Sequence, residues 1–386
     1  MSDQQYVNSE CYPPPVAPPL EGSPKHQRYN LPRQESARIQ DSEEKTTTLR
    51  KQGFPEGLVN ALTTNILSFP LRIWVVDNSG SMQIGDGNRI TGDQHKLKFI
   101  KGTRWHEIQD CVMYHSEMAG LLEAPTVFRM LNDPGYAVGP QQFSIAEKGK
   151  ECIPDEMTQI RNTLHKCRPG GVTPLTGHLR KIRSNIEGMA PSLRSEGKRV
   201  AVIIATDGIP TDGVGYQSDS TRSEFVNALR GLEGLPVWVV IRLCTDEEAV
   251  VDFYNEIDEQ LELNIDVLDD FVGEAAEVYQ HNKWLNYALP LHRCREMGFH
   301  DRLFDLLDEH TFTAAEVRDF CALLFGSENF EDLPDPNIDW DAFKKALKKL
   351  NDGEKLQWNP IKKKATKWVD LSQLDKMFGP TSCVIS

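Results

Sequence analysis

The chain has 386 residues, of which 39% are hydrophobic, and a formal net charge of -14 at pH 7. This length suits one α/β domain of about 200 residues together with a smaller unit and some disorder. Phosphate binding depends on lysine and arginine, so the acidic balance argues against nucleic acid as a partner. The eight cysteines are widely spaced, which is typical of free thiols in a reducing compartment. With no apolar leader and no run approaching ~18 apolar residues, we expect a cytoplasmic protein.

The first 50 residues are rich in proline and mixed charges, including Pro13-Pro14-Pro15 and Pro18-Pro19. Such a segment buries too little apolar surface to compensate the entropy lost on ordering. We therefore predict a disordered tail over residues 1–50. A proline motif that docks onto a partner is the alternative.

From about residue 70 to residue 270, short apolar runs alternate with segments that have apolar residues at the helical period. The candidate strands are Leu71–Val76, Thr126–Leu131, Gln141–Ala146, Arg199–Thr206, Pro236–Leu243 and Asn264–Leu268. The candidate helices are Trp105–Leu122, Met157–Leu164 and Leu175–Met189, and Thr221 with Glu224 and Thr245 with Glu248 have the spacing of helix caps. This alternation predicts an α/β fold with a doubly wound, mostly parallel sheet and helices on both faces.

The regions outside this alternation lead to three further expectations. The Gly-rich and charged segment from Gln83 to Gly102 is expected to be a loop. Residues 271–350 are expected to form a small helical appendage, in which Thr313 caps a helix through Glu316 and another helix covers Asp341–Leu350. Residues 351–386 are expected to form a basic, flexible tail.

Polar residues follow two of the apolar runs at the point where each run ends. The first run ends in Asp77-Asn78-Ser79-Gly80-Ser81, and the run at Arg199–Thr206 ends in Asp207. Because ligand sites in parallel sheets gather at the carboxyl ends of the strands, we expect both aspartates at one sheet edge. Thr173 lies between them in sequence, within a Gly- and Pro-containing turn.

With Asp77, Ser79, Ser81, Thr173 and Asp207 in this order, residues 70–270 resemble the von Willebrand factor A domain. The resemblance implies a metal-ion-dependent adhesion site in which these five residues hold Mg²⁺, or Mn²⁺ or Ca²⁺ in its place. Mg²⁺ prefers oxygen ligands in octahedral geometry, and neutral hydroxyls leave much of its charge unbalanced. The resemblance therefore implies a non-enzymatic module that binds an Asp or Glu carboxylate of a partner protein. One departure is Val172, which separates Thr173 from the glycines that often precede it directly in the family.

Other interpretations of these residues remain open. Each could have only a local role in a cap or turn, which would leave a scaffold with a vestigial metal site. A metal-assisted hydrolase is a weaker alternative, because the sequence shows no positioned base. A phosphohydrolase of the haloacid dehalogenase type would also need a second acid where Ser79 stands. A calcium loop that starts at Asp77 fails because Met82 and Asn88 replace its required Gly and Glu. The scattered histidines are more consistent with packed or surface residues than with metal ligands.

The sequence ends in Cys383-Val384-Ile385-Ser386, which resembles a prenylation box. One lipid chain holds a protein only weakly, so a second signal is needed. The lysine-rich segment Lys362–Lys367 could supply that signal by contacting anionic lipid. We therefore expect lipidation at Cys383 and peripheral membrane association, with a solvated basic segment as the alternative.

Overall fold

The computed structural model describes residues 43–379, and the statements below concern these residues. Most of the predicted N-terminal tail and the predicted lipidation site, Cys383, lie outside them. The predicted tail reaches residue 50, but Glu43–Lys51 form a helix, α1, in which Leu49 is buried.

The centre of the fold is a six-stranded sheet in the order β5-β4-β1-β6-β7-β8. All neighbouring pairs are parallel except β4 and β5, which are antiparallel. The strands are β1 (Leu71–Val76), β4 (Thr126–Met130), β5 (Gln142–Ile145), β6 (Val200–Thr206), β7 (Val237–Leu243) and β8 (Ile265–Leu268). The six predicted strands are thus confirmed to within two residues at each end. Strands β4 and β5 extend the sheet on one side of β1, and β7 and β8 extend it on the far side of β6. The order in which strands are added therefore changes direction between the neighbours β1 and β6.

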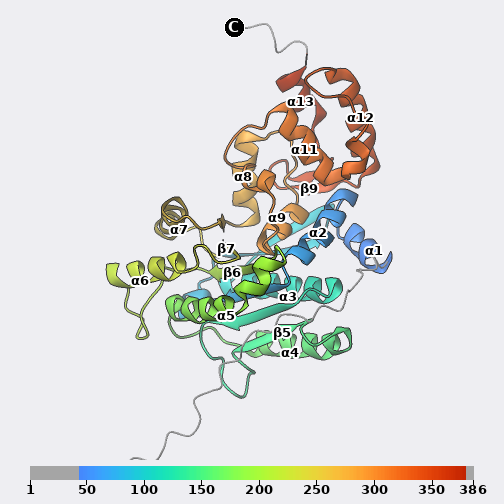
Figure 1. Ribbon diagram of the computed structural model, residues 1–386. Coiled ribbons are helices and arrows are strands. Elements are labelled where there is room, and N and C mark those ends of the chain that lie inside the picture. Colours follow the sequence, from blue (N-terminus) through green and yellow to red (C-terminus); the bar gives the residue numbers. More distant parts are fainter. Residues whose placement is uncertain (1–42, 380–386) are drawn as a thin grey trace, which may run out of the picture. The chain divides into compact units, whose positions relative to one another are not determined.

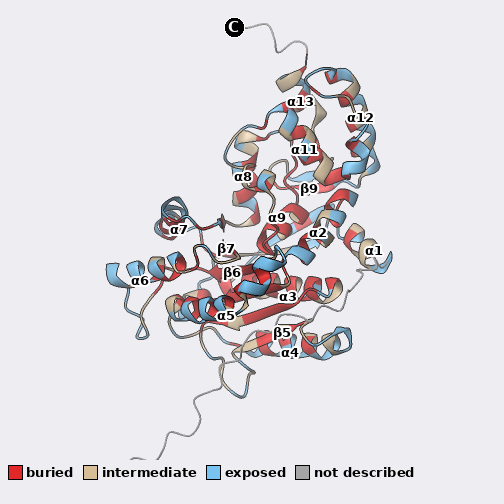
Figure 2. Ribbon diagram, in the orientation of Figure 1, coloured by how far each residue is buried: buried red, intermediate tan, exposed pale blue. Residues whose placement is uncertain are grey.

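Helices flank this sheet (Figure 1). The flanking helices include α3 (Arg104–Leu122), α4 (Ile153–Lys166), α5 (Leu175–Ser195), α6 (Asp219–Arg230) and α7 (Glu248–Gln260). Every residue of β1, β6 and β7 is buried, which requires cover on both faces of these strands, whereas the flanking helices have exposed sides (Figure 2). Apolar side chains of α3 and α4 pack in one cluster with Trp74, Phe128 and Ile203 of three neighbouring strands.

The predicted helix starts agree with the structure in one case and differ in two. Thr313 and Glu316 form the predicted capping box at the start of α11. For α6 the cap is Ser218, and Thr221 stands at the third helical position as its partner. For α7 the Thr245 hydroxyl accepts a hydrogen bond from the Glu247 backbone N–H at 3.2 Å, before the helix begins.

The predicted loop from Gln83 to Gly102 is largely a β-hairpin. After a short 3-10 turn at Gly80–Gln83, β2 (Gly87–Asp93) and β3 (Lys96–Gly102) pair antiparallel. The prediction failed because charged residues alternate irregularly with Ile90, Leu97 and Phe99, so neither strand has a clear apolar face in the sequence. The hairpin lies against α3.

The C-terminal region packs with the N-terminal helices in one core. Leu58 and Leu62 of α2 (Glu56–Ser68) belong to the same apolar cluster as Phe320 of α11 and Phe343 of α12. The helices of this region are α8 (Phe271–His281), α9 (Leu289–Glu296), α10 (Arg302–Asp305), α11 (Ala314–Phe325), α12 (Trp340–Gly353) and α13 (Leu371–Phe378). The predicted appendage over residues 271–350 therefore shares its core with α2, a helix that the sequence patterns did not predict.

The predicted flexible tail over residues 351–386 is folded as far as it is described. It contains β9 (Gln357–Asn359) and β10 (Lys364–Thr366), which pair antiparallel, followed by α13. Two of its buried residues, Trp368 and Leu374, are 0% exposed. Isolated aromatic residues among lysines gave no periodic signal, so the sequence alone suggested a tail.

Within residues 43–379, no helix is long and apolar enough to cross a membrane. Several lysines that could approach anionic lipid are already in ion pairs. The pairs are Lys344 with Asp375 (2.8 Å), Lys348 with Asp352 (2.6 Å), Lys362 with Asp370 (2.8 Å) and Lys367 with Asp352 (3.6 Å). The pairs of Lys362 and Lys367 reduce the positive charge that the segment Lys362–Lys367 could present to lipid, and the other two pairs do the same for the lysines of the preceding helix.

Candidate metal centre at the sheet edge

Strands β1 and β6 place Asp77 and Asp207 at the same edge of the sheet. The Asp77 backbone N–H continues the strand pairing by donating to Ala205 O at 2.9 Å. Asp207 follows directly after Thr206, the last residue of β6. Both aspartates are buried, with 0% and 2% exposure. They lie where the direction of strand order reverses, which is where ligands bind in open parallel sheets.

Hydrogen bonds connect four of the five predicted site residues in a chain. The Asp77 carboxylate accepts from the Ser79 backbone N–H at 2.8 Å. The Ser79 and Ser81 hydroxyls are 3.0 Å apart, and the Ser81 hydroxyl donates to Asp207 Oδ1 at 2.9 Å. The second Asp77 oxygen accepts from the Thr206 hydroxyl at 2.6 Å. The two serines therefore connect the two carboxylates, and the Thr206 hydroxyl holds the other oxygen of Asp77 in place.

The loop that contains Thr173 is bonded to the turn after β1. Gly80 N–H donates to Gly171 O at 3.2 Å, and Gly170 N–H donates to Asn78 O at 2.8 Å. Gly171 has φ +90°, and a Cβ there would lie 2.5 Å from Asn132 Oδ1, so only glycine fits this bend. Val172 follows this bend, and its carbonyl oxygen accepts a hydrogen bond from the Asn132 side-chain amide at 2.8 Å.

The same loop brings Thr173 close to the turn that follows Asp207. A Cβ on Gly208, the residue after Asp207, would lie 3.9 Å from Thr173 Oγ1. Thr173 is 6% exposed, and its backbone N–H donates to Thr211 Oγ1 at 3.0 Å. All five predicted residues are thus gathered at one sheet edge. Gly80 is exposed and Ser81 half-buried, so this edge reaches the surface.

The sequence did not predict Arg104, which enters this site from the first turn of α3. Its guanidinium lies 3.0 Å from Asp207 Oδ2 and also pairs with Asp86 and Glu247, each at 2.7 Å. Arg104 thereby ties Asp207 to the segment before β2 and to the start of α7. A single arginine at a helix N-terminus carries no sequence signal for such a role, whereas Thr206, next to Asp207, could have been suspected from its position.

The two carboxylates differ in their electrostatic surroundings. Burial, and then the nearby charge of Asp207, raises the pKa of Asp77 to about 6. Burial also raises the pKa of Asp207, while hydrogen bonds from Ser81 and Arg104 oppose that shift. Within residues 43–379, Arg104 pairs with Asp207, but no cationic side chain forms an ion pair with Asp77. Asp77 is therefore a buried acid without a counter-charge.

This donor set fits a hard divalent cation. The groups that would hold it are two carboxylates and three hydroxyls, which are the oxygen ligands that Mg²⁺ and Ca²⁺ prefer. A cation would also supply the positive charge that Asp77 lacks. Nothing in the donor set separates Mg²⁺ from Mn²⁺ or Ca²⁺.

No protein-family model matches the chain, and no curated protein matches it. Among solved structures, it is similar to a mutant of the PilB minor pilin from Streptococcus sanguinis, with 11% identity and a TM-score of 0.33. The match covers 52% of this chain and 57% of the pilin chain, so it spans less than two thirds of the pilin. A likeness this weak carries no argument about fold or function.

Proposed function

We propose that the chain is a metal-dependent protein-binding module with a von Willebrand factor A-like fold. Asp77, Ser79, Ser81, Thr173 and Asp207 would hold the divalent cation. The cation would supply positive charge at the surface edge and would attract an Asp or Glu carboxylate of a partner protein. The observation that carries this proposal is the chain of hydrogen bonds between the two buried carboxylates. It runs from Asp77 to the Ser79 backbone N–H, and from the Ser79 hydroxyl through the Ser81 hydroxyl to Asp207.

The strand order supports the proposed fold. Numbered along the chain within the central sheet, the strands follow the order 3-2-1-4-5-6. This is the order of many doubly wound folds, which bind ligands between strands 1 and 4. Those two strands are β1 and β6 here, and the five site residues lie at their carboxyl ends or in the loop beside them.

The scaffold with a vestigial metal site is the second candidate, and Arg104 is the observation that favours it. Its guanidinium already supplies one positive charge to Asp207. If that charge sufficed, the site could hold its shape without a cation and the partner contacts would lie elsewhere. In the described part of the chain Asp77 forms no ion pair, which favours the metal-binding alternative.

A pull-down with the full chain distinguishes the two candidates. Four arms are needed: wild type with Mg²⁺, wild type with chelator, Asp77→Asn with Mg²⁺, and the matched control Asp219→Asn, which removes an exposed aspartate at the start of α6. The metal-dependent module predicts partners that are lost with chelator and with Asp77→Asn but retained with Asp219→Asn. Identical partners in all four arms would leave only the scaffold.

We further propose that a lipid on Cys383 brings this module to membranes. The terminal sequence supports prenylation, whereas the ion pairs of Lys344, Lys348, Lys362 and Lys367 weaken the basic second signal. Cys383→Ser should move the protein from membrane to soluble fractions. An unmodified Cys383 in the intact mass of the cellular protein would remove the anchor from this proposal.

A further inference from the structure

A pocket of about 340 Å³ lies in the C-terminal region, where three segments that are distant in sequence meet. Its lining comes from residues 283–286, from α12, and from the β9–β10 hairpin with the chain that follows it. Hydrogen bonds hold two of these segments together. The Asn286 backbone N–H donates to Trp368 O at 2.8 Å, and the Asp370 backbone N–H donates to Trp284 O at 2.7 Å. The size and the fixed walls of this lysine pocket suit a small molecule.

The lining of the lysine pocket carries an excess of positive charge. It contains two aspartates, Asp352 and Asp370, and five lysines, so three positive charges are unbalanced. The lysines are Lys283, Lys348, Lys362, Lys364 and Lys367. Because the whole chain has a net charge of -14, a local excess of lysines in a concave place indicates a site for an anion.

Every one of these lysines can still donate to a ligand. Lys283 and Lys364 are exposed, and neither forms an ion pair within residues 43–379. Lys362 pairs with one aspartate, and Lys367 lies 3.6 Å from the other while donating to the Asp352 backbone oxygen at 3.1 Å. An ammonium group has three hydrogen-bond donors, so each paired lysine keeps at least one for an incoming anion.

Asn286 adds an observation that does not depend on charge. It lines the pocket and is 3% exposed. Its Nδ2 donates to Gln357 O at 3.2 Å, but its Oδ1 has no hydrogen-bond partner among the described residues. Buried polar atoms without a partner are uncommon, so this acceptor calls for a donor. A ligand hydroxyl, directly or through a water, supplies one, whereas an ionised phosphate oxygen does not.

These features narrow the chemical class of the ligand. The lysines come from three different segments, so a ligand that uses them all carries its negative groups in several directions from a compact centre. Trp284 is the aromatic residue of the described lining, and it is 0% exposed, so no ring face is available on which a nucleobase could stack. A small polyol ring with several phosphate groups meets both requirements and also supplies the hydroxyl.

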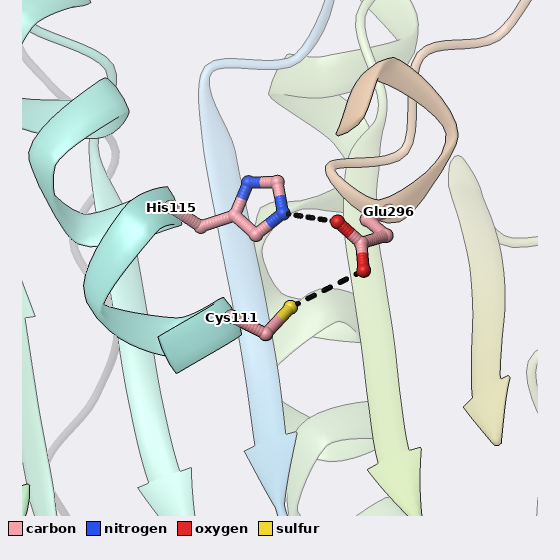
Figure 3. Close-up of side chains that lie close together, drawn as sticks. All are labelled: Cys111, His115 and Glu296. Carbon is pink, nitrogen blue, oxygen red and sulfur yellow. Dashed lines mark hydrogen bonds and ion pairs between the residues drawn. The ribbon is translucent and has the colours of Figure 1, made fainter. Parts of the chain in front are cut away.

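The buried cluster around Glu296, between α3 and α9, calls for no such ligand. Cys111 Sγ and His115 Nε2 lie 3.4 Å and 3.0 Å from the two oxygens of the Glu296 carboxylate (Figure 3). Arg293 and Arg242 pair with the same carboxylate at 2.7 Å and 3.6 Å. Its charge is already balanced and its oxygens are already bonded, whereas the lysine pocket has unbalanced charge and is open to solvent.

We propose that the lysine pocket binds a multiply phosphorylated inositol, either free in solution or as the headgroup of a membrane lipid. The lysine ammonium groups contact the phosphates, and Asn286 Oδ1 accepts a hydrogen bond from a ring hydroxyl. Binding is non-covalent and includes no chemical step. The proposal depends neither on a metal at the sheet edge nor on a lipid at Cys383.

Calorimetric titration of the full chain with inositol trisphosphate tests this proposal. Wild type should bind a single molecule per chain. Lys283→Gln/Lys364→Gln should bind at least about tenfold more weakly, because two charged hydrogen bonds are lost. The matched control is Lys345→Gln/Lys349→Gln, which removes two exposed lysines of α12 outside the pocket and should bind as wild type does. Equal weakening in both double variants, or a wild type that does not bind, would overturn the proposal.

Vesicle sedimentation separates the two sources of the ligand. All arms carry Cys383→Ser, so that a lipid on that residue cannot contribute. A lipid headgroup predicts sedimentation with phosphatidylcholine vesicles that contain phosphatidylinositol bisphosphate, and less with phosphatidylserine vesicles of equal charge. A free inositol phosphate predicts tight titration without sedimentation. Equal sedimentation with both vesicles, unchanged by Lys283→Gln/Lys364→Gln, would contradict the pocket.

Asp77→Asn separates this proposal from the function proposed at the sheet edge. The variant should bind inositol trisphosphate as wild type does, because Asp77 does not line the pocket. If the metal response of the edge is absent but the titration succeeds, the proposed function fails and the lysine pocket stands. A titration that weakens in Asp77→Asn as much as in Lys283→Gln/Lys364→Gln would contradict the assignment of the ligand to the pocket.

Discussion

The sheet edge at Asp77 and the buried cluster at Glu296 organise charge in opposite ways. At the edge, hydroxyls and carboxylates of different loops converge near the surface, and within residues 43–379 Arg104 is the cation that pairs with Asp207. In the cluster, Glu296 is completely enclosed, and its immediate partners are two guanidinium groups, two imidazoles and a thiol. Among the described residues, the edge has more carboxylates than cations and is open to solvent, whereas the cluster is close to balanced and closed.

This difference indicates that the edge can bind a partner, whereas the cluster can only stabilise the fold. An exchangeable ligand needs a surface position, and only the edge offers one through Gly80 and Ser81. A buried ion pair that loses one member leaves an uncompensated charge, so the cluster should respond to mutation through stability. The predictions below test this contrast, beginning with the largest expected effect.

Glu296→Gln should be the most destabilising change, because it leaves Arg242 and Arg293 buried without their shared carboxylate. We expect a loss of about 3–5 kcal/mol in the free energy of unfolding, measured by urea denaturation. Glu256→Gln, which alters an exposed glutamate on α7, should change stability by less than about 0.5 kcal/mol. If both variants unfold alike, Glu296 is not the centre of a balanced buried network.

Acid should weaken the part of the fold beside the sheet edge at Asp77 through His178. This side chain is 7% exposed on α5 and lies 3.0 Å from Leu131 O, at the end of β4. Burial, and then the charge of Arg129, lowers its pKa from 6.5 to about 4. The unfolded chain therefore takes up the proton first, so stability is present above pH 6.5 and is lost as pH falls toward 4. The loss should reach about 3 kcal/mol.

Urea denaturation of wild type and His178→Gln at pH 7 and at pH 4.5 isolates this contribution. Glutamine can keep a hydrogen bond to Leu131 O but takes up no proton in this range. The difference in stability between the two pH values should therefore be smaller in His178→Gln than in wild type. An equal difference would assign the acid sensitivity to other groups.

Arg104→Gln should change both the stability and the metal affinity of the sheet edge. Without the guanidinium, Asp207 is left buried and unpaired, so the metal-free protein should melt earlier than wild type. Its affinity for Mg²⁺ should rise by about tenfold, or 1.4 kcal/mol, because a competing positive charge is gone. Thermal melts over a Mg²⁺ titration measure both effects. A variant that melts earlier but shows no stronger metal response would indicate that Arg104 replaces the cation.

The sequence predicted the central sheet well because β1, β6 and β7 are mostly apolar and buried throughout, and each predicted strand ended near the residue where the strand ends. The sequence also identified Asp77, Ser79, Ser81, Thr173 and Asp207 as candidate site residues, because each stands in a recognisable short motif at a strand end or in a turn. Whether these five residues bind metal stays a prediction, although the structure places them together.

The remaining features depend on contacts between distant segments, which no local pattern encodes. Arg104 reaches Asp207 across 103 residues, and His115 reaches Glu296 across 181 residues. The four-residue spacing of Cys111 and His115 was visible in the sequence, but its counterpart on α9 could not be paired with it. The packing of α2 against α11 was hidden for the same reason.

The central claim is that the edge at Asp77 binds a divalent cation, and thermal unfolding with and without Mg²⁺ tests it most directly. A cation at one hundred times its Kd should stabilise wild type by about 2.7 kcal/mol, and Asp219→Asn should respond equally. Asp77→Asn should show no metal response, yet its metal-free form should be at least as stable as wild type, since one of two repelling buried carboxylates is gone. A wild type that ignores Mg²⁺, Mn²⁺ and Ca²⁺, or an Asp77→Asn variant that responds as wild type does, would contradict the claim.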